Sequence, residues 1–146
     1  MLPKAIVELI VRSLKRSARR YRGSRGVGQE WERLAEKKLK AAGYRVLERN
    51  FRTRVGELDF VAEQEGVLCF IEVKGRRTTQ FGMPEEAVTG EKQRRIFRAA
   101  QAYLQRRRRP DVPCRFDVVA ILETESKTDI RILQDAFCGP PPPRRR

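Results

Sequence analysis

The stretch from residue 56 to residue 74 reads GELDFVAEQEGVLCFIEVK. Two apolar runs, 58–62 and 67–74, are separated by Glu-Gln-Glu-Gly, a composition typical of a turn between two strands. Because side chains alternate between the faces of a strand, Glu72 and Lys74 point the same way, about 6.6 Å apart. If the hairpin closes at residues 63–66, Asp59 comes from the adjacent strand and projects to the same side. The stretch therefore predicts a hairpin that carries two carboxylates and an amine on one face.

These residue types indicate a site for a hard divalent cation. Charged side chains on an apolar strand are costly unless they are paired or have a function. Two carboxylates, backbone carbonyls and waters suit Mg²⁺ or Mn²⁺, and a cation beside an ammonium can activate water. A Glu-x-Lys pair alone is typical of an exposed ion pair. Glu57 shares the face of Asp59 and stays an alternative ligand if the register slips.

Helical spacing precedes the hairpin. Between Gly28 and Ala42 the apolar residues form one stripe, and Gly43 is a typical end signal. At 100° per residue, Glu32 falls at the edge of that stripe. The carboxylate of Glu32 is therefore expected beside the buried face of this helix.

The remaining elements complete an α/β pattern. Before the hairpin, a strand is expected at 44–52. After the hairpin, a long helix is expected that follows Pro84 and ends before Pro110. Two strands are expected at 115–122 and 130–133. The order α-β-β-β-α-β-β predicts a mixed β-sheet with helices packed on its faces.

Two groups of charges in these later elements have open interpretations. Arg115 and Asp117 share one face of their strand, and they suit a structural ion pair as well as a functional one. The four arginines at 106–109 suit both the helix dipole and contact with phosphate.

The charge is unevenly distributed along the 146 residues. The chain holds 33 Lys and Arg against 19 Asp and Glu, a formal charge of +14. Residues 1–25 account for +7 and the three final arginines for +3, so 26–143 keeps +4. The balance suggests a polyanionic partner, either nucleic acid or an anionic membrane surface. The pattern predicts a basic N-terminal arm at 1–25 with helical spacing, a folded domain at 26–138 and a disordered Pro/Arg tail at 139–146.

The absence of histidine excludes several classes of site. Without His there is no Ser-His-Asp or Cys-His centre and no His-ligated zinc. The three cysteines lack a C-x-x-C pair, which argues against a zinc knuckle or a redox motif. A reduced, cytoplasmic protein is expected. No apolar run reaches the ~18–20 residues of a transmembrane segment.

Five blocks of the sequence resemble one known family. They are residues 28–35, 48–52, 56–59, 70–74 and 115–119, in that order. The chain resembles the bacterial YraN family (UPF0102), a branch of the PD-(D/E)XK nuclease superfamily related to archaeal Holliday-junction resolvases. The resemblance covers about residues 26–137 and implies a restriction-endonuclease-like core.

The resemblance implies a role for each matching position. Asp59 and Glu72 correspond to the metal-binding carboxylates, with the Val73 carbonyl as a third ligand. Lys74 resembles the lysine that activates or orients the attacking water, and Glu32 the acid on the preceding helix. By their position, Arg76 and Arg77, which follow Lys74 after one glycine, are expected to contact nucleic acid, with a solvated loop as the alternative. Lys92 and Gln93 on the long helix are expected there too, and Gln93 resembles an auxiliary glutamine of the relatives.

The expected function is hydrolysis of DNA phosphodiesters with Mg²⁺ or Mn²⁺, leaving 5′-phosphate and 3′-hydroxyl ends. Branched DNA as substrate and a homodimer follow only by analogy with the resolvases. Two alternatives stay open. One is a nucleic-acid-binding module without catalytic activity, and the other is a basic peripheral membrane or interaction protein.

Overall fold

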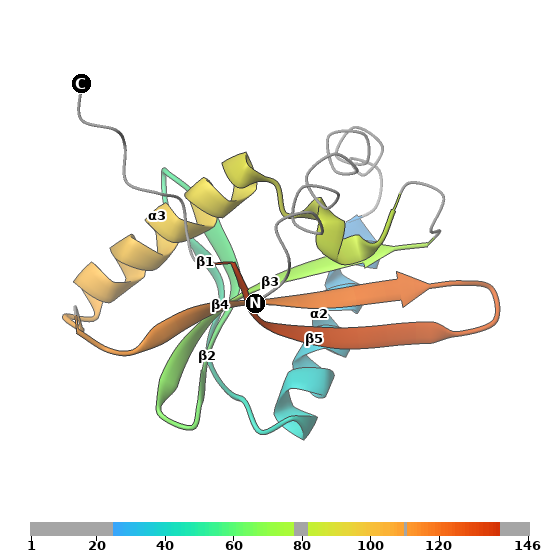
Figure 1. Ribbon diagram of the computed structural model, residues 1–146, viewed down its shortest axis with the longest axis horizontal. Helices are drawn as coiled ribbons and strands as arrows, with labels where there is room; N and C mark the ends of the chain where they lie inside the picture. Colours follow the sequence, from blue (N-terminus) through green and yellow to red (C-terminus); the bar gives the residue numbers. More distant parts are fainter. Residues whose placement is uncertain (1–24, 78–81, 110, 138–146) are drawn as a thin grey trace.

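The computed structural model describes residues 25–77, 82–109 and 111–137 (Figure 1). The predicted order of helices and strands is confirmed, with one short 3-10 helix added. The predictions for the N-terminal arm and the C-terminal tail lie almost wholly outside the described residues. The elements are α2 (Arg25–Ala41), β1 (Arg45–Arg52), β2 (Glu57–Gln64), β3 (Val67–Arg76), η2 (Pro84–Ala87), α3 (Gly90–Arg106), β4 (Cys114–Glu123) and β5 (Thr128–Phe137).

The five strands form one mixed sheet in the order β1-β2-β3-β4-β5. All neighbouring pairs are antiparallel except β3 and β4, which run parallel from Leu68↔Cys114 to Arg76↔Leu122. A parallel pair needs a crossover, and η2 and α3 supply it. This is the predicted α/β architecture with a restriction-endonuclease-like core.

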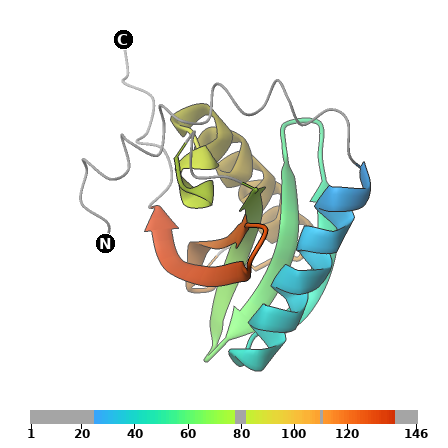
Figure 2. The ribbon, with the colours of Figure 1, turned by 90° about the vertical axis from the view of Figure 1, so that its right-hand side faces the viewer.

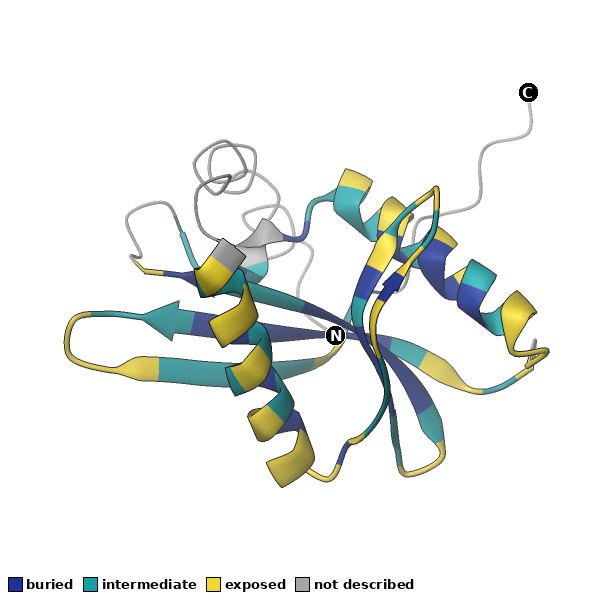
Figure 3. Ribbon diagram, turned by 180° about the vertical axis from the view of Figure 1, so that it is seen from behind, coloured by how far each residue is buried: buried dark blue, intermediate teal, exposed yellow. Residues whose placement is uncertain are grey.

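Each face of the sheet is covered by one helix (Figure 2). The stripe of α2 places Trp31, Ala35 and Leu39 in one core cluster with buried sheet residues such as Phe60 and Ile71. The stripe of α3 joins the opposite cluster, which includes Phe70 and Phe116. Residues 60–62 of β2 and 68–71 of β3 therefore alternate between the two cores, and at least half of each strand is buried (Figure 3).

The hairpin forms where it was predicted. Gln64 pairs with Val67, and Glu65 and Gly66 make a two-residue turn with φ of 51° and 79°. Such a turn matches the twist of antiparallel strands. It fixes the register that brings the ends of β2 and β3 together.

Two predicted elements are corrected. The long helix does not start at Pro84: Pro84 opens η2, and α3 begins at Gly90. Thr89 separates them, because its extended backbone and its hydroxyl, which accepts from the Lys92 backbone N–H, form an N-cap. The last strand spans ten residues, because a register shift after Phe116 and a positive φ at Asp135 let pairing continue to Phe137.

A tight contact anchors α2 to β3 directly after Lys74. A Cβ at Gly75 would lie 2.2 Å from the ring of Trp31, so only glycine admits the indole there. The indole Nε1 also donates to Glu123 on β4 at 3.1 Å. In the described ranges, no helix is long and apolar enough to cross a membrane.

Candidate metal site

The pairing of β2 and β3 ends at Phe60↔Ile71, one residue before Asp59 and Glu72 would face each other. Beyond that point, Asp59 Oδ2 accepts a hydrogen bond from the Val73 backbone N–H at 2.8 Å. A side chain thus takes over where the backbone ladder stops. The opening of the hairpin places the Asp59 carboxylate beside Glu72.

Four charged residues form the cluster at this site: Asp59, Glu72, Lys74 and Lys92. Glu72 is the most buried of them, with 3% of its surface exposed. Its Oε1 lies 3.3 Å from Lys74 Nζ on the same strand and 3.3 Å from Lys92 Nζ on α3. Its Oε2 is buried and has no hydrogen-bond partner among the described residues. One oxygen of this carboxylate is therefore held by two lysines, and the other meets no hydrogen-bond donor among the described residues.

The two carboxylates have opposite pKa shifts. Burial, together with the charge of Glu72, raises the pKa of Asp59 well above its ordinary value. Burial also acts against ionisation of Glu72, but the charges of Lys74 and Lys92 outweigh it and lower the pKa of Glu72. The charge of Glu72 in turn raises the pKa of Lys92. Without a cation, the pair therefore favours one ionised and one protonated carboxyl.

Glu32 and Glu57 lie at the margin of this cluster. Glu32 is half-buried, and burial raises its pKa, with a further contribution from the charges of Glu57 and Glu72. The structure therefore places Glu32 at the edge of the helix stripe, as its position predicts. Glu57 is exposed and its nearest cation is Arg52, at 3.6 Å. Of the two rivals, Asp59 is the residue brought to Glu72.

The donor set fits a divalent cation that keeps several waters. No group of three or more His, Cys, Asp or Glu side chains converges within the ranges described. Mg²⁺ is commonly held by one or two carboxylates and completes its octahedral shell with water. Asp59 and the free Oε2 of Glu72 supply that number. The Val73 carbonyl stays a predicted third ligand.

The residues predicted to contact nucleic acid lie in different settings. Arg76 is 4% exposed, and its Nη1 donates to the Gly82 carbonyl at 3.2 Å, so its guanidinium supports the chain after β3. Arg77 is exposed, 3.7 Å from a carboxylate oxygen of Glu123. Gln93 Nε2 donates to the Val88 carbonyl at 3.1 Å, at the start of α3.

Lys92 belongs to the site itself. The sequence predicts that Lys92 contacts nucleic acid, and the structure places its Nζ 3.3 Å from Glu72 Oε1. The sequence holds no local signal for this contact, because it depends on how α3 crosses the sheet. Only the preceding Thr89, a typical N-cap residue, indicates that Lys92 lies in the first turn of a helix.

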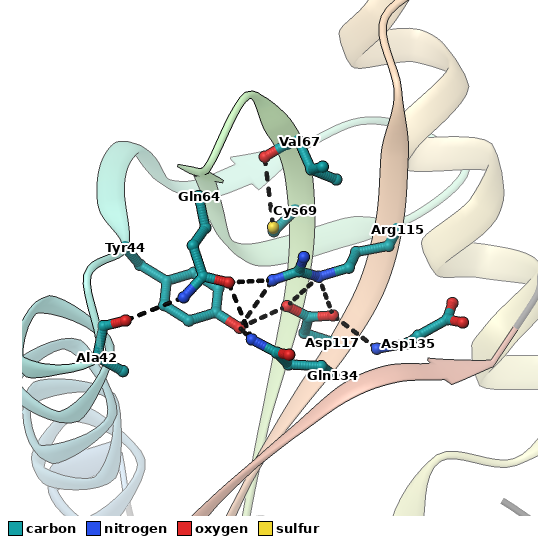
Figure 4. Close-up of polar contacts among 9 residues, drawn as sticks. All are labelled: Ala42, Tyr44, Gln64, Val67, Cys69, Arg115, Asp117, Gln134 and Asp135. Atoms are coloured by element: carbon teal, nitrogen blue, oxygen red, sulfur yellow. Dashed lines mark hydrogen bonds and ion pairs between the residues drawn. The ribbon is translucent and has the colours of Figure 1, made fainter. Parts of the chain in front are cut away.

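A second buried carboxylate lies elsewhere, in the polar network of Figure 4. Asp117 is fully buried and accepts from Arg115 Nε at 3.0 Å, from the Tyr44 hydroxyl at 2.8 Å and from the Asp135 backbone N–H at 2.9 Å. Gln64 and Gln134 complete this network with hydrogen bonds to each other and to its members. Both oxygens of Asp117 are satisfied, which favours the structural interpretation of the Arg115–Asp117 pair.

Comparison with known proteins places these residues in a family. The model of "Uncharacterised protein family UPF0102" matches residues 31–121, a range that contains all of the cluster.

Several similar proteins have the same family name. The chain is 47% identical to a UPF0102 protein of Symbiobacterium thermophilum over 115 residues, which cover 78% of this chain and 98% of that protein. It is 49% identical to one of Lachnoclostridium phytofermentans over 100 residues, 68% of this chain and 81% of that protein. With one of Chlorobaculum parvum it shares 51% identity over 96 residues, 66% of this chain and 74% of that protein.

Proposed function

The chain belongs to the UPF0102 family, and we propose that it is a divalent-metal-dependent nuclease that hydrolyses DNA phosphodiesters. One observation carries the proposal. Glu72 keeps one buried oxygen without a partner next to Asp59, while two lysines hold its other oxygen. A buried carboxylate oxygen without a partner is costly, and a function that requires it explains why it is kept.

Each residue of the cluster has a role in this proposal. Asp59 and Glu72 would hold Mg²⁺ or Mn²⁺. The bound cation would supply a Lewis acid that makes water more acidic and offsets the charge of the phosphate. Lys74 is partly exposed at the end of β3, so its ammonium can orient a water or contact a phosphate oxygen. Lys92 holds the same oxygen of Glu72 that Lys74 contacts.

The reaction itself is a simple hydrolysis. The oxygen of a water forms a bond to phosphorus, and the bond from phosphorus to the 3′-oxygen breaks. One proton of the water ends on the 3′-oxygen, which leaves 5′-phosphate and 3′-hydroxyl ends. Lys74 would stabilise the charge on the phosphate. Electrostatic contributions of this kind dominate phosphoryl-transfer catalysis.

The direct test is a cleavage assay with purified protein and Mg²⁺ or Mn²⁺. Lys74→Ala should lower the rate by about 100-fold or more, because it removes the group that orients water or stabilises charge. Asp59→Ala should lower it at least as far. Lys37→Ala on the exposed face of α2 is a matched control and should cleave like the wild type.

The assay includes linear duplex DNA, single strands and a four-way junction, because we propose branched DNA as the preferred substrate. Our proposal also extends to a homodimer acting in the cytoplasm. The nuclease proposal fails if the wild type cleaves none of these substrates. It also fails if Lys74→Ala and Asp59→Ala cleave as fast as the wild type. Binding without cleavage would then favour a nucleic-acid-binding module.

A further inference from the structure

The turn between β1 and β2, residues 53–56, lies beside α3 (Figure 3). Val55 of this turn lines two pockets. The first pocket has a volume of about 490 Å³ and is lined by Arg52, Arg54, Lys92 and Arg95, with Glu57 as its one carboxylate. Since Lys92 also contacts Glu72, this pocket shares one residue with the candidate metal site.

The second pocket continues along α3. It has a volume of about 790 Å³, and its cations are Arg98 and Arg108, with no acidic residue in the lining. Val55 lines both pockets and is 46% exposed, the one large hydrophobic side chain in the described part of the chain that is so exposed. We call the two pockets and Val55 the α3 groove.

The turn is held firmly. The Thr53 hydroxyl donates to the Gly56 carbonyl at 2.9 Å and accepts from the backbone N–H groups of Val55 and Gly56. A Cβ at Gly56 would lie 2.3 Å from the Arg95 carbonyl oxygen, so the turn packs directly on the backbone of α3. Arg54 and Val55 are therefore presented at a fixed place beside the helix.

Three arginines of the groove are available to an anionic partner. Arg52 and Arg95 have carboxylates at 3.6 and 3.2 Å, from Glu57 and Glu91. By contrast, Arg54, Arg98 and Arg108 are exposed and make no ion pair with any residue that the structure describes. Exposed cations without counter-charges, gathered on one face, attract polyanions.

We propose that the α3 groove binds the phosphate backbone of a nucleic acid strand that leads away from Glu72. This inference rests on the proposed nuclease function. Along the axis of α3, Arg98 lies about 9 Å beyond Lys92 and about 120° around the helix from it, so the cations wind around α3 from the first pocket to the second. Arg54 contacts phosphate on one side of Val55, Arg98 and Arg108 on the other, and Val55 packs against a sugar or base between them. An apolar ridge between cationic pockets suits a strand whose phosphates and bases alternate.

The test compares two triple variants of the full chain with equal loss of charge. The first, Arg54→Ala/Arg98→Ala/Arg108→Ala, removes the unpaired cations of the groove. The control, Lys37→Ala/Lys38→Ala/Lys127→Ala, removes three exposed lysines outside it. Fluorescence anisotropy measures the binding of labelled single-stranded and duplex DNA in EDTA over a series of salt concentrations. Thermal unfolding of both variants checks that they remain folded.

The groove variant should bind DNA at least ~10-fold more weakly than the control. The negative slope of log K against log salt should become shallower by about 2–3, since each phosphate contact contributes roughly 0.7–0.9 to its magnitude. The control should keep the slope of the wild type. Equal affinities and slopes for the two variants would overturn the inference. So would poly-glutamate that competes as well as DNA of the same charge, because the groove would then select charge alone.

The binding assay needs no catalysis, so the two proposals can fail separately. If the wild type cleaves DNA but the groove variant binds like its control, the groove assignment is wrong and the nuclease proposal stands. If the wild type does not cleave and the groove variant loses binding, the groove stands as a nucleic-acid surface and the nuclease proposal fails.

Discussion

Glu72 and Asp117 are both buried carboxylates on neighbouring strands of one sheet, but their surroundings differ. Asp117 has partners on both oxygens, supplied by Arg115, Tyr44 and the backbone of β5. Glu72 has two lysines on Oε1, and its Oε2 lacks a partner among the described residues. The first arrangement is complete within the protein. The second leaves one buried acceptor without a donor.

The difference separates a structural role from a functional one. A buried polar network that is fully satisfied rigidifies its surroundings, while an unsatisfied group is costly to keep. The Asp117 network joins Tyr44, the residue before β1, to β2, β4 and β5. The cluster around Glu72 brings the two carboxyl groups of Asp59 and Glu72 together and leaves Glu72 Oε2 without a hydrogen-bond donor. Such an arrangement lowers the stability of the fold, which is typical of functional sites.

The largest expected effect concerns Asp117. Asp117→Ala leaves the Arg115 guanidinium and the Asp135 backbone N–H without their acceptor, and should lower the free energy of unfolding by about 3–5 kcal/mol. Urea unfolding followed by circular dichroism measures this. Tyr44→Phe removes one hydroxyl of the same network and should cost only about 0.5–1.5 kcal/mol. A loss below about 1 kcal/mol for Asp117→Ala would contradict the structural role of the network.

A smaller effect of opposite sign is expected at Asp59. In EDTA, Asp59→Asn should raise the free energy of unfolding by about 0.5–2 kcal/mol at pH 8, because it removes a buried carboxyl that resists ionisation. Asparagine can still accept the hydrogen bond from the Val73 N–H.

The gain should depend on pH. The pKa of Asp59 is raised in the folded protein, so the folded state holds its proton longer than the unfolded chain does. Wild-type stability therefore falls as pH rises from the ordinary pKa of Asp59 toward its raised pKa, so the advantage of Asp59→Asn should be larger at pH 8 than at pH 5. Asp111→Asn at an exposed site is the control. If Asp59→Asn instead lowers the free energy of unfolding by the same amount at pH 5 and at pH 8, the account is contradicted.

Much of this site could be predicted from the sequence because it is local. Asp59, Glu72 and Lys74 lie on one hairpin, and strand alternation together with a two-residue turn places them on one side. The stripe of α2 placed Glu32 in the same way. Patterns of period 2 and 3.6 carry this information without knowledge of the rest of the chain.

The remaining features depend on contacts between distant segments. Lys92 reaches Glu72 only because α3 crosses the sheet, and no spacing in the sequence encodes that contact. The break at Thr89 was hidden because the apolar spacing of Val88 and Ile96 continues across it. The role of Asp117 required partners from two distant segments, Tyr44 and Asp135, which lie 73 and 18 residues away.

The most direct test of the central claim is a calorimetric titration with Mn²⁺, in the absence of DNA. The account predicts binding to the wild type that is lost in Glu72→Gln, where the orphaned oxygen and its charge are altered. Glu57→Gln, a change of the same kind at the exposed neighbouring acid, should bind Mn²⁺ like the wild type. Equal Mn²⁺ affinity of Glu72→Gln and the wild type, or no binding to the wild type, would contradict the claim that Asp59 and Glu72 form a metal site.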